Sequence, residues 1–171
     1  RDSSTSRGLG DVYKRQIFPY GENLFIGAQS GMHIYSLENK EEPLWLSTYE
    51  HLTSCDPVVV QDDFAFVTLR GGTECFGFNN QLDIVDVSNL KDPKLFKTYD
   101  MINPHGLGID GNCLFISEGD YGLKMFDITN LEDIKLTKHF EDLSSLDVIP
   151  YQLSLIHISE PTRRRGISYA V

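Results

Sequence analysis

Residues 82–93 read LDIVDVSNLKDP, and this stretch decides the fold. Apolar side chains fill most of its first half, at a spacing that suits a strand buried on one or both faces. The second half is polar and ends at Pro93, which lacks a backbone N–H and therefore favours a turn over a continuing strand. The stretch predicts a buried strand followed by a tight turn.

The same pattern occurs twice more, at residues 32–43 (MHIYSLENKEEP) and 123–134 (LKMFDITNLEDI). Each copy follows two short apolar runs separated by turn residues, and each precedes a further short run. The preceding runs are 18–27, 59–68 and 108–117, and the final runs are 44–49, 94–99 and 135–140. Glycine, asparagine and aspartate between the first two runs favour tight hairpins. The repeated unit is therefore predicted to be four antiparallel strands.

Four-stranded units of about 40 to 45 residues are typical of β-propeller blades. We therefore predict an all-β fold with about three four-stranded antiparallel blades of an incomplete propeller, at 17–51, 55–101 and 104–142. A fourth blade is expected to begin at 146–152, because VIPY at 148–151 repeats IFPY at 17–20. The second copy is longer through extra residues at 69–80, between its second and third strands. The first strand of each blade is expected to line the channel.

The run from Leu82 to Pro93 resembles the signature of LVIVD-repeat proteins, and the other two copies are weaker versions of it. Ser36 replaces the aspartate of the motif in the first copy, and Ile134 replaces its proline in the third. The resemblance implies a bacterial propeller that is secreted or held in the cell envelope, often as a lipoprotein. It also implies that a lipid anchor could lie in a missing N-terminal segment.

The two ends of the chain form an unusual pair. Residues 11–16 (DVYKRQ) and 153–158 (LSLIHI) can be encoded by complementary strands of one DNA sequence. Both ends resemble translated sequencing-library adapter, so we expect 1–16 and 153–171 to be artefacts with disordered flanks and exclude them from fold reasoning. The natural segment is then 17–152. We expect 153–158, with its alternating apolar residues, to imitate a strand and pair with the fourth copy.

Charge narrows the class of partner. Residues 17–152 hold 8 basic and 22 acidic residues, a formal net charge of −14. Such a surface repels phosphate backbones, so nucleic acid is not an expected partner. The segment has no apolar stretch near the roughly 20 residues of a membrane span. We expect no cofactor, and a protein or glycan ligand bound at a loop face.

Four residues are the candidates for ligand binding. His105 follows Pro104 at the mouth of an inner strand, where it could bind a ligand or act as a general base, or simply pack the channel entrance. Arg70 is the only arginine within 17–152 and could anchor an anionic ligand. Glu118 and Asp120 lie on a loop that either carries ligand-binding carboxylates or is a solvated turn. No catalytic residue is predicted.

The three cysteines of the chain predict no metal site. Cys55 and Cys75 flank one predicted hairpin, so they could form a disulfide in an oxidising compartment or remain as free thiols. Cys113 begins an apolar strand and is expected to pack as a small hydrophobic residue. The cysteines lack the paired spacing of a zinc site, so none is expected.

Three functions are open at this point. The first is a non-enzymatic binding or scaffold module of the bacterial cell surface or envelope, favoured by the repeats and by the lack of a catalytic constellation. The alternative is a propeller-type hydrolase or lyase in which His105 acts with residues of missing blades. A weaker third possibility is a purely structural module of a larger secreted protein.

Overall fold

The computed structural model describes residues 16–28, 31–50, 57–71, 79–151 and 154–158. These residues form fourteen strands and no helix. The strands are β1 (Gln16–Tyr20), β2 (Asn23–Ala28), β3 (Gly31–Ser36), β4 (Leu44–Tyr49), β5 (Val58–Gln61), β6 (Phe64–Leu69), β7 (Gln81–Asp86), β8 (Lys94–Asp100), β9 (Leu107–Asp110), β10 (Cys113–Ser117), β11 (Leu123–Asp127), β12 (Lys135–Phe140), β13 (Asp147–Tyr151) and β14 (Ser154–Ile158). None of the described residues belongs to a helix that could cross a membrane.

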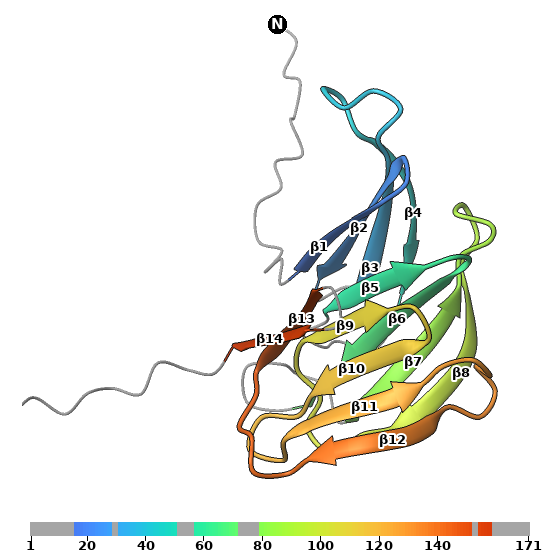
Figure 1. Ribbon diagram of the computed structural model, residues 1–171. Helices are drawn as coiled ribbons and strands as arrows, with labels where there is room; N and C mark the ends of the chain where they lie inside the picture. The colour runs from blue at the N-terminus through green and yellow to red at the C-terminus, as the bar shows by residue number, and fades with distance from the viewer. Residues whose placement is uncertain (1–15, 29–30, 51–56, 72–78, 152–153, 159–171) are drawn as a thin grey trace, which may run out of the picture.

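The strands form three four-stranded antiparallel sheets, in the orders β1 to β4, β5 to β8 and β9 to β12, and a two-stranded sheet of β13 and β14. Within each sheet, strands that follow one another in sequence are paired, so each sheet is a meander (Figure 1). The predicted all-β fold of three open blades is confirmed.

The predicted alignment of the three copies is also confirmed by the strand register. The aligned apolar residues of the second strands pair with the equivalent residue of each first strand: Ile26 with Ile17, Val67 with Val58, and Ile116 with Leu107. The longer connection of the second copy runs from the end of β6 to the start of β7. Equivalent positions of the three sheets can therefore be compared directly.

The first strands of successive sheets contact one another: β1 lies against β5, β5 against β9, and β9 against β13. Figure 1 shows these strands gathered along one side of the arc, with β4, β8 and β12 along the opposite side. Most of β8 and β12 is exposed, whereas β5 and β6 are largely buried. First strands are therefore inner and fourth strands outer, as expected for propeller blades.

Each core layer lies between two sheets. The layer between the first and second sheets includes Phe25, Met32 and Ile34 on one side and Val67, Val85 and Val87 on the other. The layer between the second and third sheets repeats it, with Phe66, Leu82 and Ile84 facing Ile116, Phe126 and Ile128. Because both faces of a sheet are covered, its inner strands carry continuous apolar runs.

The polar half of the repeat forms the same turn in all three sheets. Asp86 and Asp127 each accept a hydrogen bond from the backbone N–H two residues later, at 2.9 Å, and Ser36 does so at 3.3 Å. The following asparagine repeats this contact in each copy: Asn39, Asn89 and Asn130. These side chains are turn formers. The serine hydroxyl of the first copy therefore serves as the same kind of acceptor as the aspartate.

The strand pairing expected at the C-terminal end is present. β14 pairs with β13 in an antiparallel register that joins Tyr151 to Ser154 and Val148 to His157. His157 thus holds the register position that Ile26, Val67 and Ile116 hold in the three complete sheets. Of the proposed artefact at 1–16 and 153–171, Gln16 belongs to β1 and residues 154–158 form β14, so the expected disorder is wrong at these positions. The rest of both flanks lies outside the described residues.

Candidate functional site

The four candidate residues come from three separate segments. Arg70 directly follows β6, His105 lies two residues before β9, and Glu118 and Asp120 lie between β10 and β11. First strands begin and second strands end on the same side of a meander, so these segments meet on one loop face of the arc. We call Arg70, Asn103, His105 and Asp120 the loop site.

Arg70 and His105 are in direct contact. The Nη1 nitrogen of Arg70 lies 3.0 Å from Nδ1 and 2.9 Å from Nε2 of His105. A nitrogen placed so evenly between the two ring nitrogens lies over the face of the imidazole, because the Cε1–H would block it within the ring plane. The Arg70 guanidinium is therefore in direct contact with the imidazole of His105.

The environment of His105 keeps its ring neutral. Burial, together with the charge of Arg70, lowers the pKa of His105 to about 4, although the carboxylates of Asp120 and Glu118 oppose the shift. At neutral pH the imidazole therefore carries one donor and one acceptor nitrogen. A neutral ring is also the form that tolerates a guanidinium in contact with it.

Asn103 and Gly119 complete the surroundings of the ring. The Nδ2 amide of Asn103 lies 3.2 Å from Nε2 of His105. This amide can donate to Nε2 in the tautomer whose ring proton is on Nδ1. Gly119 has a φ of +62°, and a Cβ at this position would lie 3.0 Å from Asn103 Nδ2 and 3.1 Å from His105 Nε2. Glycine thus lets the 118–122 loop approach the ring closely.

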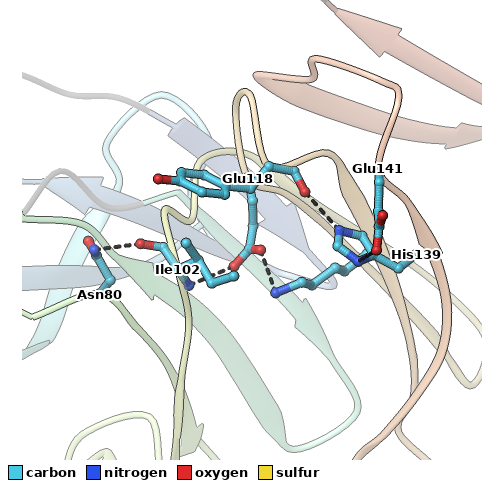
Figure 2. A network of polar contacts seen from close by, with 7 residues as sticks. Asn80, Ile102, Glu118, His139 and Glu141 are labelled. Atoms are coloured by element: carbon cyan, nitrogen blue, oxygen red, sulfur yellow. Dashed lines mark hydrogen bonds and ion pairs between the residues drawn. The ribbon is translucent and has the colours of Figure 1, made fainter.

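Glu118 does not face solvent, as its side chain is fully buried. Figure 2 shows its carboxylate between Ile102 and the neighbouring strand: Oε1 accepts the backbone N–H of Ile102 at 2.9 Å, and Oε2 lies 2.5 Å from Nζ of Lys124. The Ile102 carbonyl in turn accepts the Asn80 amide at 2.6 Å. Glu118 is therefore a structural tie beneath the loop site, and the prediction that it binds ligand directly does not fit its burial.

Asp120 is exposed and lies next to this tie. Its Oδ1 accepts a hydrogen bond from the Ser144 hydroxyl at 3.0 Å. Two large apolar side chains are exposed beside these groups. Ile102, in the segment that precedes β9, is 47% exposed, and Tyr121, in the loop of Asp120, is 53% exposed. The loop site therefore combines a cation, a carboxylate, an amide and a neutral imidazole with exposed apolar surface.

The remaining predicted residues lie elsewhere. Cys55 and Cys75, the proposed disulfide, lie outside the described residues. Cys113 is half-buried at the start of β10 and packs at the edge of a core cluster. His33 and His139 lie on β3 and β12, away from the predicted channel mouth. Within the described ranges no group of histidine, cysteine and carboxylate side chains could hold a metal ion.

Sequence reasoning missed Asn103 and the buried pair of Glu118 and Lys124. The aligned repeats did contain a signal for the pair. Glu118, directly after β10, occupies the repeat position of Ala28 and Leu69, which end the equivalent strands β2 and β6. A carboxylate at an otherwise apolar position indicates a buried partner. Asn103 carried no such signal, because an asparagine in the turn before a strand is common, and its contact with His105 two residues later depends on how that loop folds.

The LVIVD repeat family matches residues 54–101, which is the second sheet with the segment before it. A comparison with curated proteins finds no match.

Two solved structures resemble the chain in fold. The crystal structure of the computationally designed Ika4 protein matches with a TM-score of 0.62 and 10% identity, over 88% of this chain and 87% of that one. The crystal structure of Citrobacter koseri AztD matches with a TM-score of 0.56 and 14% identity, over 86% of this chain and 41% of that one. At these identities the likeness concerns the fold alone.

Proposed function

Because the chain carries an LVIVD repeat within an arc of propeller blades, we propose that it belongs to a non-enzymatic binding or scaffold protein of the bacterial cell surface or envelope. The ligand binds at the loop site. The observation that supports this most is the convergence of Arg70, His105 and Asp120 from three segments of two adjacent sheets.

Binding groups on loops above a rigid sheet scaffold are a common way to build a recognition surface. Here the scaffold holds its loops tightly. The Thr68 hydroxyl of β6 donates to the His105 carbonyl at 2.8 Å, and the His105 N–H donates to the Ser117 carbonyl at 2.7 Å. The backbone that carries His105 is thus fixed from both neighbouring sheets, which reduces the entropy lost when a ligand binds.

The contacts of His105 favour binding over catalysis. A general base needs a ring nitrogen directed at the substrate proton. In the described residues, Arg70 contacts both ring nitrogens of His105 and Asn103 contacts Nε2. These contacts suit a ring that supports an arginine.

The test uses the full-length protein, immobilised and exposed to fractionated envelope material from the source cell. Wild type is compared with Arg70→Gln and with Lys97→Gln, a control that also removes one positive charge but lies on outer strand β8. We expect Arg70→Gln to reduce the bound material and Lys97→Gln to leave it unchanged. Turnover of ester, lactone or glycoside substrates that is lost in His105→Ala would instead identify an enzyme.

Placement in the envelope has its own test. Cells that express the tagged full-length protein are fractionated, and intact cells are treated with protease. We expect the protein in the membrane, periplasmic or surface fraction. Recovery in the cytosolic fraction alone would contradict this part of the proposal.

A further inference from the structure

We infer that the ligand of the loop site is a saccharide that carries a carboxylate, with Arg70 binding the carboxylate and Asn103, His105 and Asp120 binding hydroxyl groups. This inference rests on the proposed function and narrows it to one ligand class. It comes from the mixture of groups that the fold brings together there.

The hydrogen-bonding groups of the loop site match those of a sugar. A sugar hydroxyl is both donor and acceptor, so it needs both kinds of partner nearby. Asp120 supplies exposed acceptor oxygens, and Asn103 supplies an amide with both donor and acceptor atoms. His105, neutral in this environment, has one donor and one acceptor nitrogen. A site for phosphate would gather several cations, and a site for a metal ion would gather carboxylates alone.

Arg70 accounts for the carboxylate. It is the only arginine among the 8 basic and 22 acidic residues of 17–152, so its position on the loop face is distinctive. A guanidinium binds a carboxylate through two parallel N–H groups, which lysine cannot do. Contact with His105 holds one nitrogen of the guanidinium in place, while the neutral ring adds no competing charge.

Exposed apolar surface flanks these polar groups. Ile102 and Tyr121 are 47% and 53% exposed, and they belong to the two segments that meet at Gly119. The C–H face of a pyranose ring is apolar and packs against such side chains, above all against an aromatic ring. A purely polar ligand, such as a free inorganic anion, would leave this surface unused.

The buried tie holds the two segments at a fixed separation. Glu118 accepts the Ile102 N–H and pairs with Lys124, so it joins the segment of Asn103 and His105 to the loop of Asp120 and Tyr121. A weakly binding ligand such as a saccharide benefits most when the protein groups are already in place. Burying an ion pair at an otherwise apolar position costs free energy. Its presence here is consistent with a role in fixing the arrangement of the two segments.

The experiment titrates the full-length protein by calorimetry with three probes: oligogalacturonate, the neutral oligogalactose of equal length, and oligoglutamate of equal charge. The variants are Arg70→Gln, Tyr121→Ala and the outer-strand control Lys97→Gln. We expect oligogalacturonate to bind more tightly than either other probe. Arg70→Gln and Tyr121→Ala should each weaken it by about tenfold, and Lys97→Gln should leave it unchanged.

Two results would overturn the inference. Binding of oligoglutamate as tight as that of oligogalacturonate, with no effect of Tyr121→Ala, would identify a general polyanion site. Binding of none of the three probes, while Arg70→Gln still abolishes capture of an envelope protein, would show that the ligand is a protein. In both cases the proposed binding function survives. If instead Arg70→Gln captured as much envelope material as wild type, the proposed binding site would also be refuted.

Discussion

The Tyr99 hydroxyl, on outer strand β8, donates a 2.7 Å hydrogen bond to the Leu131 carbonyl in the outer turn of the next sheet. The same hydroxyl accepts the Ile134 N–H at 3.2 Å. One sheet earlier, the Ser47 hydroxyl of β4 donates to the Leu90 carbonyl, which is the equivalent turn position. Adjacent sheets are therefore joined at the outer side by a repeated hydroxyl contact, as well as by their apolar cores.

Tyr99→Phe removes both contacts of this hydroxyl and keeps the ring. We expect a loss of about 1 to 2 kcal/mol in the free energy of unfolding, because the Leu131 carbonyl and the Ile134 N–H lose a partner at a half-buried place. Chemical denaturation of the full-length protein measures it. Tyr121→Phe, at a 53% exposed residue, is the control and should change stability by less than about 0.5 kcal/mol. Equal effects would show that the inter-sheet contact contributes nothing.

The buried pair of Glu118 and Lys124 makes a second prediction. Glu118→Leu alone leaves Lys124 with an unpaired charge at 12% exposure, and should destabilise the protein by about 3 to 5 kcal/mol. The double variant Glu118→Leu/Lys124→Met removes both charges and should recover most of that loss, except for the contact to the Ile102 N–H. A double-mutant cycle by denaturation measures the coupling. Additive effects of the two substitutions would contradict the pairing.

His105 makes stability depend on pH. Its pKa in the folded state is about 4, against an ordinary value of 6.5, so the unfolded chain binds the proton first as the pH falls. The contribution is fully present above pH 6.5 and is lost between pH 6.5 and 4. After discounting for solvent screening of a half-buried ring, we expect this loss to be about 1 to 2 kcal/mol.

The measurement compares melting temperatures of wild type and His105→Gln at pH 7.5 and pH 5. The difference between the two pH values should be smaller in His105→Gln. Hydrogen bonds from Ser88 and Thr129 lower the pKa values of the Asp86 and Asp127 carboxylates. These two groups therefore change the stability only at lower pH, below their ordinary pKa of 3.8. An unchanged pH dependence in His105→Gln would place the titrating group elsewhere.

Glycine is required at Gly122 by both conformation and space. Its φ is +96°, and a Cβ there would overlap the carbonyl oxygen of Phe140 on β12. Gly122→Ala should therefore cost about 3 kcal/mol or more. Gly111 is the matched control, because its φ is +55° and no atom lies within 4 Å of an added Cβ. Gly111→Ala should cost only about 1 kcal/mol, and denaturation midpoints compare the two.

The origin of the chain ends remains our proposal, and it has a direct genetic test. In the fourth hairpin the residues between paired Tyr151 and Ser154 are Gln152 and Leu153, where the other hairpins have glycine, aspartate or asparagine. We expect the genomic locus to diverge from this sequence before residue 17 and after residue 152. A genomic read that continues unchanged through both ends would contradict the proposal.

The fold could be predicted from the sequence because strand patterning is local. Apolar alternation, turn residues and repetition at 82–93 and its two copies place every strand of the three sheets within a few residues. The loop site could be predicted only in part. His105 and Arg70 stood out by position and rarity, but their contact depends on how two sheets meet. The burial of Glu118 reflects packing across sheets, which a repeat pattern does not encode.

The central claim is that the loop face binds the ligand, and hydrogen exchange of the full-length protein tests it most directly. Amide exchange is compared with and without the oligogalacturonate probe. We predict slower exchange at residues 101–106 and 118–122, with outer strands β8 and β12 unchanged. Protection confined to the outer strands, or unchanged exchange at both loop segments in the presence of a bound ligand, would contradict the account.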